Sequence, residues 1–196
     1  MISEEELTDE IREKIRKGKV RKISITWKIL LPVAFIIILS CLAIGLSENA
    51  TAKKTMIEMG ANEALNAAYA EQYVVDAEVV EKFIQGEASR EDLSDTMKNM
   101  EDAKADLGMS YAYVLYSDGS SFYTLFDSTD EFKDYGEVFD IDYRELSGVL
   151  GGEAYVQDYI TTDEYGTFLT AYLPIRNAQG EVIAVLGCDY DASGIS

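Results

Sequence analysis

The sequence contains no histidine, and it holds only two cysteines and two prolines among its 196 residues. The absence of histidine excludes a Ser–His–Asp triad, an imidazole general base and a histidine-ligated metal site. The two cysteines lie in different surroundings: Cys41 is inside a long apolar run, and Cys188 is in a predicted strand. A disulfide framework is therefore excluded, and we expect both to be free thiols packed among apolar neighbours.

Basic side chains are scarce beyond the first quarter of the chain. The formal net charge is −19. Residues 1–46 hold eight basic and six acidic side chains, whereas residues 47–196 hold nine basic and thirty acidic ones. Because an acidic surface repels phosphate backbones, we expect no nucleic-acid partner for the larger part. The same charge does not exclude cationic ligands.

Charged side chains are absent from residues 29–47, which read ILLPVAFIIILSCLAIGLS. At about 1.5 Å of rise per residue, this run as a helix comes close to the roughly 30 Å thickness of a bilayer's hydrocarbon core. Trp27 and Lys28 stand at its start, where an aromatic ring and a long amine favour the membrane interface. Pro32 lies near the first turns, where it can kink the helix without ending it. We therefore predict a transmembrane helix over residues 25–47.

The charges that flank this run predict its orientation. Seven basic side chains precede it closely: Lys14, Arg16, Lys17, Lys19, Arg21, Lys22 and Lys28. Only Lys53 and Lys54 follow it closely. Because basic residues resist translocation, we expect residues 1–24 to form a cytoplasmic tail in a bacterial cell membrane. Residues from 48 onward are then expected outside the membrane.

Two alternatives to a permanent anchor remain open. A cleaved signal peptide would have a shorter apolar stretch, and residues 47–50 (SENA) make a weak cleavage site. A lipoprotein signal is conceivable because Ser40 precedes Cys41, but apolar residues continue through Leu46, which a lipid-anchored terminus would not need. The length of the run favours the transmembrane helix over both.

Residues 48–108 lack proline and show small and apolar residues at helical spacing. These residues are Met56, Met59, Ala64, Ala67, Ala68, Val75, Val79, Val80 and Phe83. Gly86 is predicted to end one helix, and Ser89 with Asp92 has the spacing of a box that caps the next helix. That second helix is expected to end at Gly108. We therefore predict a membrane-proximal helical segment over residues 48–108.

The pattern changes after Met109 to short segments rich in aromatic and β-branched residues. The predicted strands cover residues 111–116, 121–128, 154–160, 167–176 and 181–190, and a predicted short helix covers residues 143–150. Asp118-Gly119 predicts a two-residue hairpin turn, and NAQG at 177–180 predicts a second hairpin. The expected fold is α+β, with a long N-terminal helix packed on a roughly five-stranded, antiparallel sheet over residues 109–196.

Three stretches of this region carry a likeness to a known family. They are YAYVLYSDG at 111–119, GEAYVQDYI at 152–160 and GTFLTAYLPIRNAQGEVIAVLGCDYDASG at 166–194. Together they resemble the Cache sensor domain, a PAS-like domain, of bacterial methyl-accepting chemotaxis proteins. The basic tail and WKILLP at 27–32 are similar to the start of clostridial-type chemoreceptors. The resemblance implies a single Cache domain whose sheet and loops form an extracytoplasmic pocket for a small polar ligand, such as an amine or an amino acid.

The resemblance also implies signalling in chemotaxis, and we expect a homodimer. No cofactor and no enzymatic activity are predicted for this region. In the family, a second membrane helix, a HAMP linker and a cytoplasmic methylation and kinase-control region follow the sensor, and residues 1–196 do not include them. A histidine kinase or a diguanylate cyclase can carry the same sensor, so both outputs remain alternatives. A stand-alone, membrane-anchored binding protein is another alternative.

Strand alternation predicts which side chains share a face of the sheet. With a two-residue turn at Asp118-Gly119, Val114 pairs with Tyr123. Tyr116, Tyr123 and Asp127 then share one face. We expect the opposite, more apolar face to pack on the helices. Its members are Tyr113, Leu115, Phe122 and Phe126. A change of one residue in the turn would exchange the two faces.

Asp189 is a carboxylate at the end of an otherwise apolar predicted strand, and Gly187 leaves room beside it. A buried charge needs a partner, and a cationic group on a ligand would supply one. Tyrosines offer a flat apolar wall and a hydroxyl, and aspartates accept hydrogen bonds from amines. The predicted ligand-binding residues are Tyr116, Tyr123, Asp127, Asp158, Tyr172 and Asp189.

The acidic stretch that follows the second predicted strand is not expected to bind a metal. Its carboxylates are Asp127, Asp130, Glu131, Asp140 and Asp142. They lack the ordered spacing and the glycine of a calcium-binding loop. We therefore expect a solvated acidic loop, and no metal site is predicted anywhere in the chain.

Overall fold

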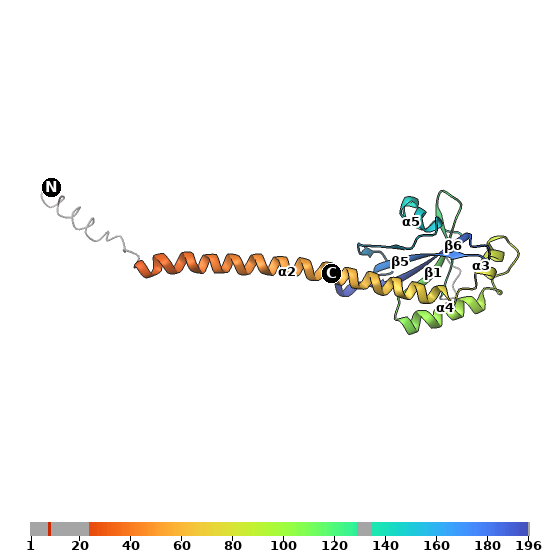
Figure 1. The fold of residues 1–196 in the computed structure, drawn as a ribbon, viewed down its shortest axis with the longest axis horizontal. Helices are drawn as coiled ribbons and strands as arrows, with labels where there is room; N and C mark the ends of the chain where they lie inside the picture. The colour runs from red at the N-terminus through yellow and green to blue at the C-terminus, as the bar shows by residue number, and fades with distance from the viewer. Residues whose placement is uncertain (1–7, 9–23, 129–134, 196) are drawn as a thin grey trace, which may run out of the picture. The chain divides into compact units, whose positions relative to one another are not determined.

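The computed structural model describes residue 8, residues 24–128 and residues 135–195 of the chain, and Figure 1 draws its helices and strands. Most of the predicted cytoplasmic tail therefore lies outside the described residues. The loop carboxylates Asp130 and Glu131 also lie outside them. The predictions made for these parts of the chain stay predictions.

Helix α2, Ile25–Gln72, is the long N-terminal helix that the sequence predicts. The chain divides at Ala50 into two compact units, and α2 contributes residues to both. Within the described residues, α2 is the one helix long and apolar enough to span a membrane. Side chains of its apolar run, such as Phe35 and Ile36, are exposed, which suits contact with lipid. These features agree with an anchor over residues 25–47, whose boundaries and orientation stay predictions.

Two shorter helices follow α2 within the segment predicted to be helical. Helix α3, Ala77–Ile84, begins after an aspartate whose carboxylate accepts hydrogen bonds from two first-turn amides. Helix α4, Ser94–Leu107, ends at Gly108, whose φ of 68° is the left-handed conformation that glycine favours. The amide and the hydroxyl of Ser89 each donate a 2.7 Å hydrogen bond to Asp92 Oδ2. These bonds close the turn that precedes α4, so the predicted start of this helix is several residues too early.

The described residues form one sheet of six antiparallel strands. Their bounds are β1 Tyr111–Ser117, β2 Phe122–Asp127, β3 Tyr155–Val156, β4 Thr161–Thr162, β5 Thr167–Arg176 and β6 Val182–Asp191. The spatial order is β2-β1-β6-β5-β3, and β4 also pairs with β5. The single strand predicted over 154–160 is wrong, because two short strands flank a loop there. Helix α5, Tyr143–Leu150, has the predicted bounds, and the α+β fold is confirmed.

Helices cover both faces of the sheet, and Figure 1 shows α4 and α5 on opposite sides of it. On one side, here called the helix face, residues of α2, α3 and α4 bury a core with strand residues such as Val114 and Leu186. On the other side, here called the α5 face, Leu146 and Val149 pack against a smaller core that includes Tyr172. The α5 face therefore combines apolar packing with polar side chains.

The turn between β1 and β2 differs from the predicted one. Tyr116 pairs with Tyr123, so the prediction that Val114 pairs with Tyr123 is wrong. The turn holds four residues rather than two, because Asp118 Oδ1 accepts hydrogen bonds from the backbone amides of Ser120 and Ser121, at 2.8 and 3.0 Å. This side-chain acceptor stabilises a wider turn than the Asp-Gly dipeptide suggests.

A β-bulge in β2 reassigns the faces of this hairpin. Leu125 has no partner on β1, so Val114 pairs with Phe126 and Tyr113 pairs with Asp127. Because one extra residue moves the following side chains to the other face, Phe126 packs on the helix face and Asp127 lies on the α5 face. The prediction that the more apolar set packs on the main helices is therefore wrong for three of its members. Tyr113, Leu115 and Phe122 line the α5 face.

Glu71 is a charged residue on the buried side of α2, and its side chain is 0% exposed. Neither of its carboxylate oxygens accepts a hydrogen bond from the described residues. The positive charge of Lys104 in α4 lowers the pKa of Glu71, but Lys104 forms its 2.7 Å ion pair with Glu101. Burial raises the pKa of Glu71 to about 7. The helix face therefore contains a carboxyl group that is largely neutral below neutral pH.

Candidate ligand-binding site

The α5 face carries a buried carboxylate, Asp189 of β6, which is 8% exposed. Tyr113 of β1 pairs with Gly187, two residues before Asp189. A β-carbon at Gly187 would lie 2.4 Å from the Tyr113 ring, so glycine is what leaves space for this ring. The Tyr113 hydroxyl then lies 3.3 Å from Asp189 Oδ1. The predicted burial of Asp189 beside room left by Gly187 is confirmed, and a tyrosine of the same chain occupies that room.

Asp189 uses one of its two carboxylate oxygens within the chain. Oδ1 accepts a 2.7 Å hydrogen bond from the Thr170 hydroxyl, and Tyr113 also approaches it. Among the described residues, none donates a hydrogen bond to Oδ2. Burial raises the pKa of Asp189 to about 6, and the contacts with Thr170 and Tyr113 oppose this rise. The carboxylate is therefore mostly ionised at pH 7, with one oxygen left for another donor.

A row of tyrosines leads from Asp189 to a second carboxylate. The rings of Tyr113 and Tyr172 are 6.4 Å apart, and their hydroxyls are 3.3 Å apart. Tyr172 stacks on Tyr155 of β3 at 6.1 Å. The Tyr155 hydroxyl donates a 2.6 Å hydrogen bond to Glu145 of α5. Burial raises the pKa of Tyr113 and Tyr172 above the usual range, so both hydroxyls stay protonated.

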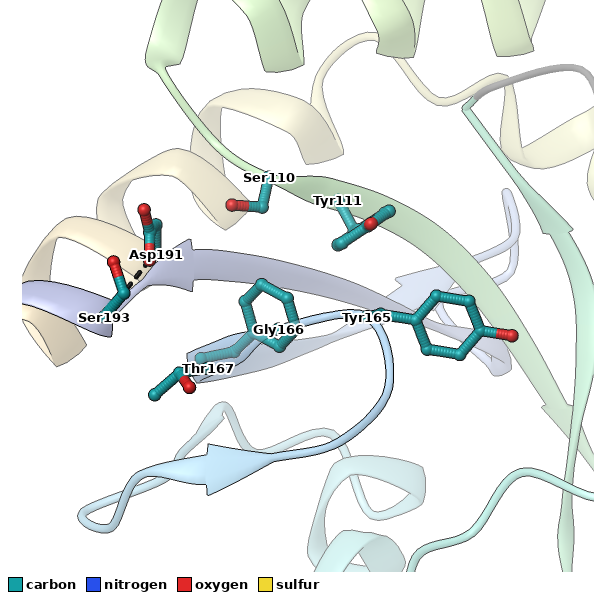
Figure 2. Close-up of a pocket in the computed structure, with 8 residues that line it drawn as sticks. Ser110, Tyr111, Tyr165, Gly166, Thr167, Asp191 and Ser193 are labelled. Atoms are coloured by element: carbon teal, nitrogen blue, oxygen red, sulfur yellow. Dashed lines mark hydrogen bonds between the residues drawn. The ribbon is translucent and has the colours of Figure 1, made fainter.

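An open cleft of about 420 Å³ lies at the ends of β1, β5 and β6, and Asp189 is not among the residues that line it. Its lining residues are Ser110, Tyr111, Tyr165, Gly166, Thr167, Phe168, Asp191 and Ser193. Tyr111 pairs with Asp189 across β1 and β6, and its ring packs edge-on against Phe168 at 5.5 Å. Figure 2 shows the Tyr111 and Tyr165 rings at one end of the cleft and Asp191 with Ser193 at the other. The cleft gives a small molecule access to the strand that carries Asp189.

The structure brings three of the six predicted site residues to the α5 face. They are Asp127, Tyr172 and Asp189. Tyr116 and Tyr123 lie on the helix face, where their rings stack at 5.3 Å. Asp158 is exposed in the loop between β3 and β4. The prediction that Asp127 shares a face with Tyr116 and Tyr123 is wrong, because the bulge intervenes. The ligand-binding role of all six stays a prediction.

Three residues of the site, Tyr113, Thr170 and Glu145, are not among the predicted ones. Strand alternation alone could have indicated Thr170, since it shares a face of β5 with Tyr172 and pairs with Asp189. Tyr113 could have been indicated once β1 was placed beside β6. For Glu145 the sequence offers no signal, because its position depends on how α5 packs on the sheet.

Gly187→Ala is expected to disturb the site and the fold together. The added methyl group would overlap the Tyr113 ring, so the ring must move away from Asp189. Overpacking of this kind costs about 1–3 kcal/mol in the free energy of unfolding. Urea unfolding of the full chain measures this loss. Gly148→Ala in α5 is the matched control, because its β-carbon would meet its nearest atom at 3.6 Å. Equal stability of Gly187→Ala and the parent would contradict this reading of the contact.

Two solved sensor domains have the same arrangement of elements. The sensor domain of the Vibrio cholerae histidine kinase DctB matches with a TM-score of 0.53 and 14% identity, over 77% of this chain and 58% of that one. The Escherichia coli DcuS sensor domain matches with a TM-score of 0.50 and 19% identity, over 72% of this chain and 95% of that one. The chain has a Cache-type sensor fold. It spans less than two thirds of the DctB domain.

The likeness is one of fold rather than of sequence. No protein-family model and no curated protein sequence matches the chain. At identities of 14% and 19%, the two sensor domains show how this chain folds and leave its ligand to be argued from its own residues. The predicted clostridial chemoreceptor type stays a prediction.

Proposed function

We propose that residues 48–196 form the extracytoplasmic sensing region of a membrane-anchored signalling receptor, and that its ligand is small and positively charged. One observation carries this proposal. Asp189 is buried, and no described lysine or arginine forms an ion pair with it. Because a buried carboxylate is stabilised by a cation that it contacts, an ammonium group at Asp189 Oδ2 would complete the site.

The other charges on the α5 face favour an amine over a carboxylic acid. Asp127 and Glu145 lie on or over this face and are acidic, as Asp189 is. An anionic ligand would be repelled by Asp189 and Glu145, whereas an ammonium group is attracted. The rings of Tyr113 and Tyr172 add surfaces that favour cations and alkyl groups.

The test is a thermal-unfolding comparison of three ligands of one size on the full chain in detergent micelles. Butylamine, butyrate and butanol differ mainly in charge. We expect butylamine to raise the Tm by a few degrees, because a ligand that binds only the folded state stabilises it. Butyrate and butanol are expected to leave the Tm unchanged. An equal shift with butyrate, or no shift with any amine, would overturn the proposal.

We propose that the N-terminus is cytoplasmic and that the sensor lies outside the membrane. The charge asymmetry around residues 25–47 supports this orientation. Ser120→Cys in the exposed β1–β2 turn is expected to react with a membrane-impermeant thiol reagent on intact cells. The parent is a built-in control, because Cys188 is buried and Cys41 lies in the apolar run. Labelling only after permeabilisation would contradict the orientation.

We propose a chemoreceptor of the methyl-accepting class as the output, acting as a homodimer. The resemblance of residues 166–194 to that class supports the output. Met59 of α2 and Tyr73, which directly follows this helix, are exposed and give a second copy apolar surface to cover. A histidine kinase is the second candidate, because the DctB sensor domain belongs to one. The coding sequence that follows Ser196 distinguishes these two outputs, and also a diguanylate cyclase or a stand-alone binding protein.

A further inference from the structure

We infer that the site on the α5 face takes a ligand with two positive charges joined by an alkyl chain, such as an aliphatic diamine. This inference rests on the proposed function and extends it. The single ammonium group required at Asp189 is one end of the ligand. Glu145 of α5, at the far end of the tyrosine row, receives the other end.

The two carboxylates share one feature, although Asp189 is buried and Glu145 is half-buried. Asp189 Oδ1 accepts a hydrogen bond from Thr170, and Glu145 Oε1 accepts hydrogen bonds from Tyr155 and Tyr159. Among the described residues, nothing donates to Asp189 Oδ2 or to Glu145 Oε2. Each carboxylate is therefore held in place by hydroxyls through one oxygen, and the second oxygen is left to accept from an ammonium group.

The tyrosine row joins the two carboxylates directly. Tyr172 lies between them, since its ring contacts Tyr113 beside Asp189 and stacks on Tyr155 beside Glu145. Burial raises the pKa of Tyr172, and the negative charges of Asp189 and Glu145 raise it further. This is expected for a hydroxyl that lies between the two carboxylates. Tyr113 and Tyr172 are buried in the structure, so the row offers apolar surface to the methylene groups of a diamine only after a neighbouring residue moves aside.

The negative charge of Glu145 disfavours an amino acid at the same two positions. An amino acid has a carboxylate in place of the second ammonium group, and it would meet Glu145 as a like charge. In the described part of the chain, the ion pairs formed by lysine involve Glu58, Glu78 and Glu101, none of which belongs to the site.

Entry to the row requires a small local movement. Tyr172 is 2% exposed, whereas Tyr159 is partly open to solvent. Tyr155 covers Tyr172 from β3, a strand of two residues at the edge of the sheet. Because so short an edge strand has few ladder hydrogen bonds, its displacement costs little compared with opening a central strand.

The experiment compares butylamine with putrescine and cadaverine by calorimetry on the full chain in detergent. We expect at least one diamine to bind about tenfold tighter than butylamine, because a second charge-assisted hydrogen bond forms. Glu145→Gln should remove this advantage, and it should lower the affinity for butylamine much less than the affinity for the diamines. Glu137→Gln, an exposed residue outside the site, is the matched control.

Reversing the charge at Glu145 gives a second, independent test of the same contact. Glu145→Lys should lose the diamines and instead favour 5-aminopentanoate, which carries an ammonium group and a carboxylate. Equal affinities for butylamine and the diamines, or an equal loss of both in Glu145→Gln, would overturn the inference while the amine proposal stands. Failure of every amine to bind the parent chain would overturn the proposed function itself.

Discussion

Asp189→Asn should weaken putrescine binding by about a hundredfold while leaving the protein as stable as the parent. Removing the charge of one partner in a buried, hydrogen-bonded ion pair typically costs several kcal/mol, which corresponds to a loss of that order. Asparagine keeps an oxygen that can accept the hydrogen bond from Thr170, so the strand pairing of β5 and β6 has no reason to change. Calorimetry and thermal unfolding of the full chain in detergent measure the two quantities.

The stability measurement separates a lost ligand contact from a damaged fold. Burial raises the pKa of Asp189 to about 6, so its charge at pH 7 already opposes folding, and its removal should not lower the Tm. Asp140→Asn, an exposed substitution of the same type, serves as the control for the loss of one negative charge. Unchanged putrescine affinity in Asp189→Asn would contradict the assignment of the site.

Glu71→Gln should stabilise the protein by roughly 3 kcal/mol at about pH 8 and by less than about 1 kcal/mol at about pH 5. Glu71 is 0% exposed, and its pKa rises from 4.5 to about 7 on folding because of burial. Between these two values the folded state binds more protons than the unfolded state. The stability of the parent is therefore highest below pH 4.5 and falls as the pH rises toward 7.

Urea unfolding of the full chain at the two pH values measures the effect. The glutamine amide is neutral at both pH values. The free energy of unfolding of the variant should therefore lack the part of the pH dependence that Glu71 causes in the parent. Lys104 of α4 lowers the pKa of Glu71, and Glu101 of α4 raises it. The charge of Glu71 in turn raises the pKa of Cys188 in β6. Glu63→Gln, an exposed change on the same helix, controls for net charge. A variant whose stability follows the parent at both pH values would show that Glu71 is partnered or hydrated.

Much of the sheet could be predicted because local sequence determines it. The bounds of β5 and α5 agree with the prediction, since NAQG fixes one hairpin and Asp142 caps α5. The same local reasoning failed at β2, where Leu125 is the extra residue of a bulge. Nothing in the sequence of a strand says which residue leaves the ladder, and one such residue exchanges the faces beyond it.

The site could be predicted only in part for a related physical reason. Asp189 was identifiable because a carboxylate inside an apolar strand needs a partner. Tyr113 and Glu145 depend on which strand lies beside β6 and on how α5 packs, and these are tertiary facts. Glu71 occupies a core position between Ala68 and Val75 at helical spacing, which argues for burial, but spacing does not reveal that no donor faces it.

The pH dependence of putrescine binding tests most directly whether a ligand cation contacts Asp189. With a pKa of about 6 in the free protein, Asp189 is half protonated at that pH, and a bound ammonium group requires it to be ionised. Calorimetry in buffers of different ionisation enthalpy should show about half a proton released at that pH, and almost none at about pH 8. Affinity should fall as the pH is lowered through 6, and Asp189→Asn should abolish the release. Proton uptake, or an affinity that is the same across this range, would contradict the account.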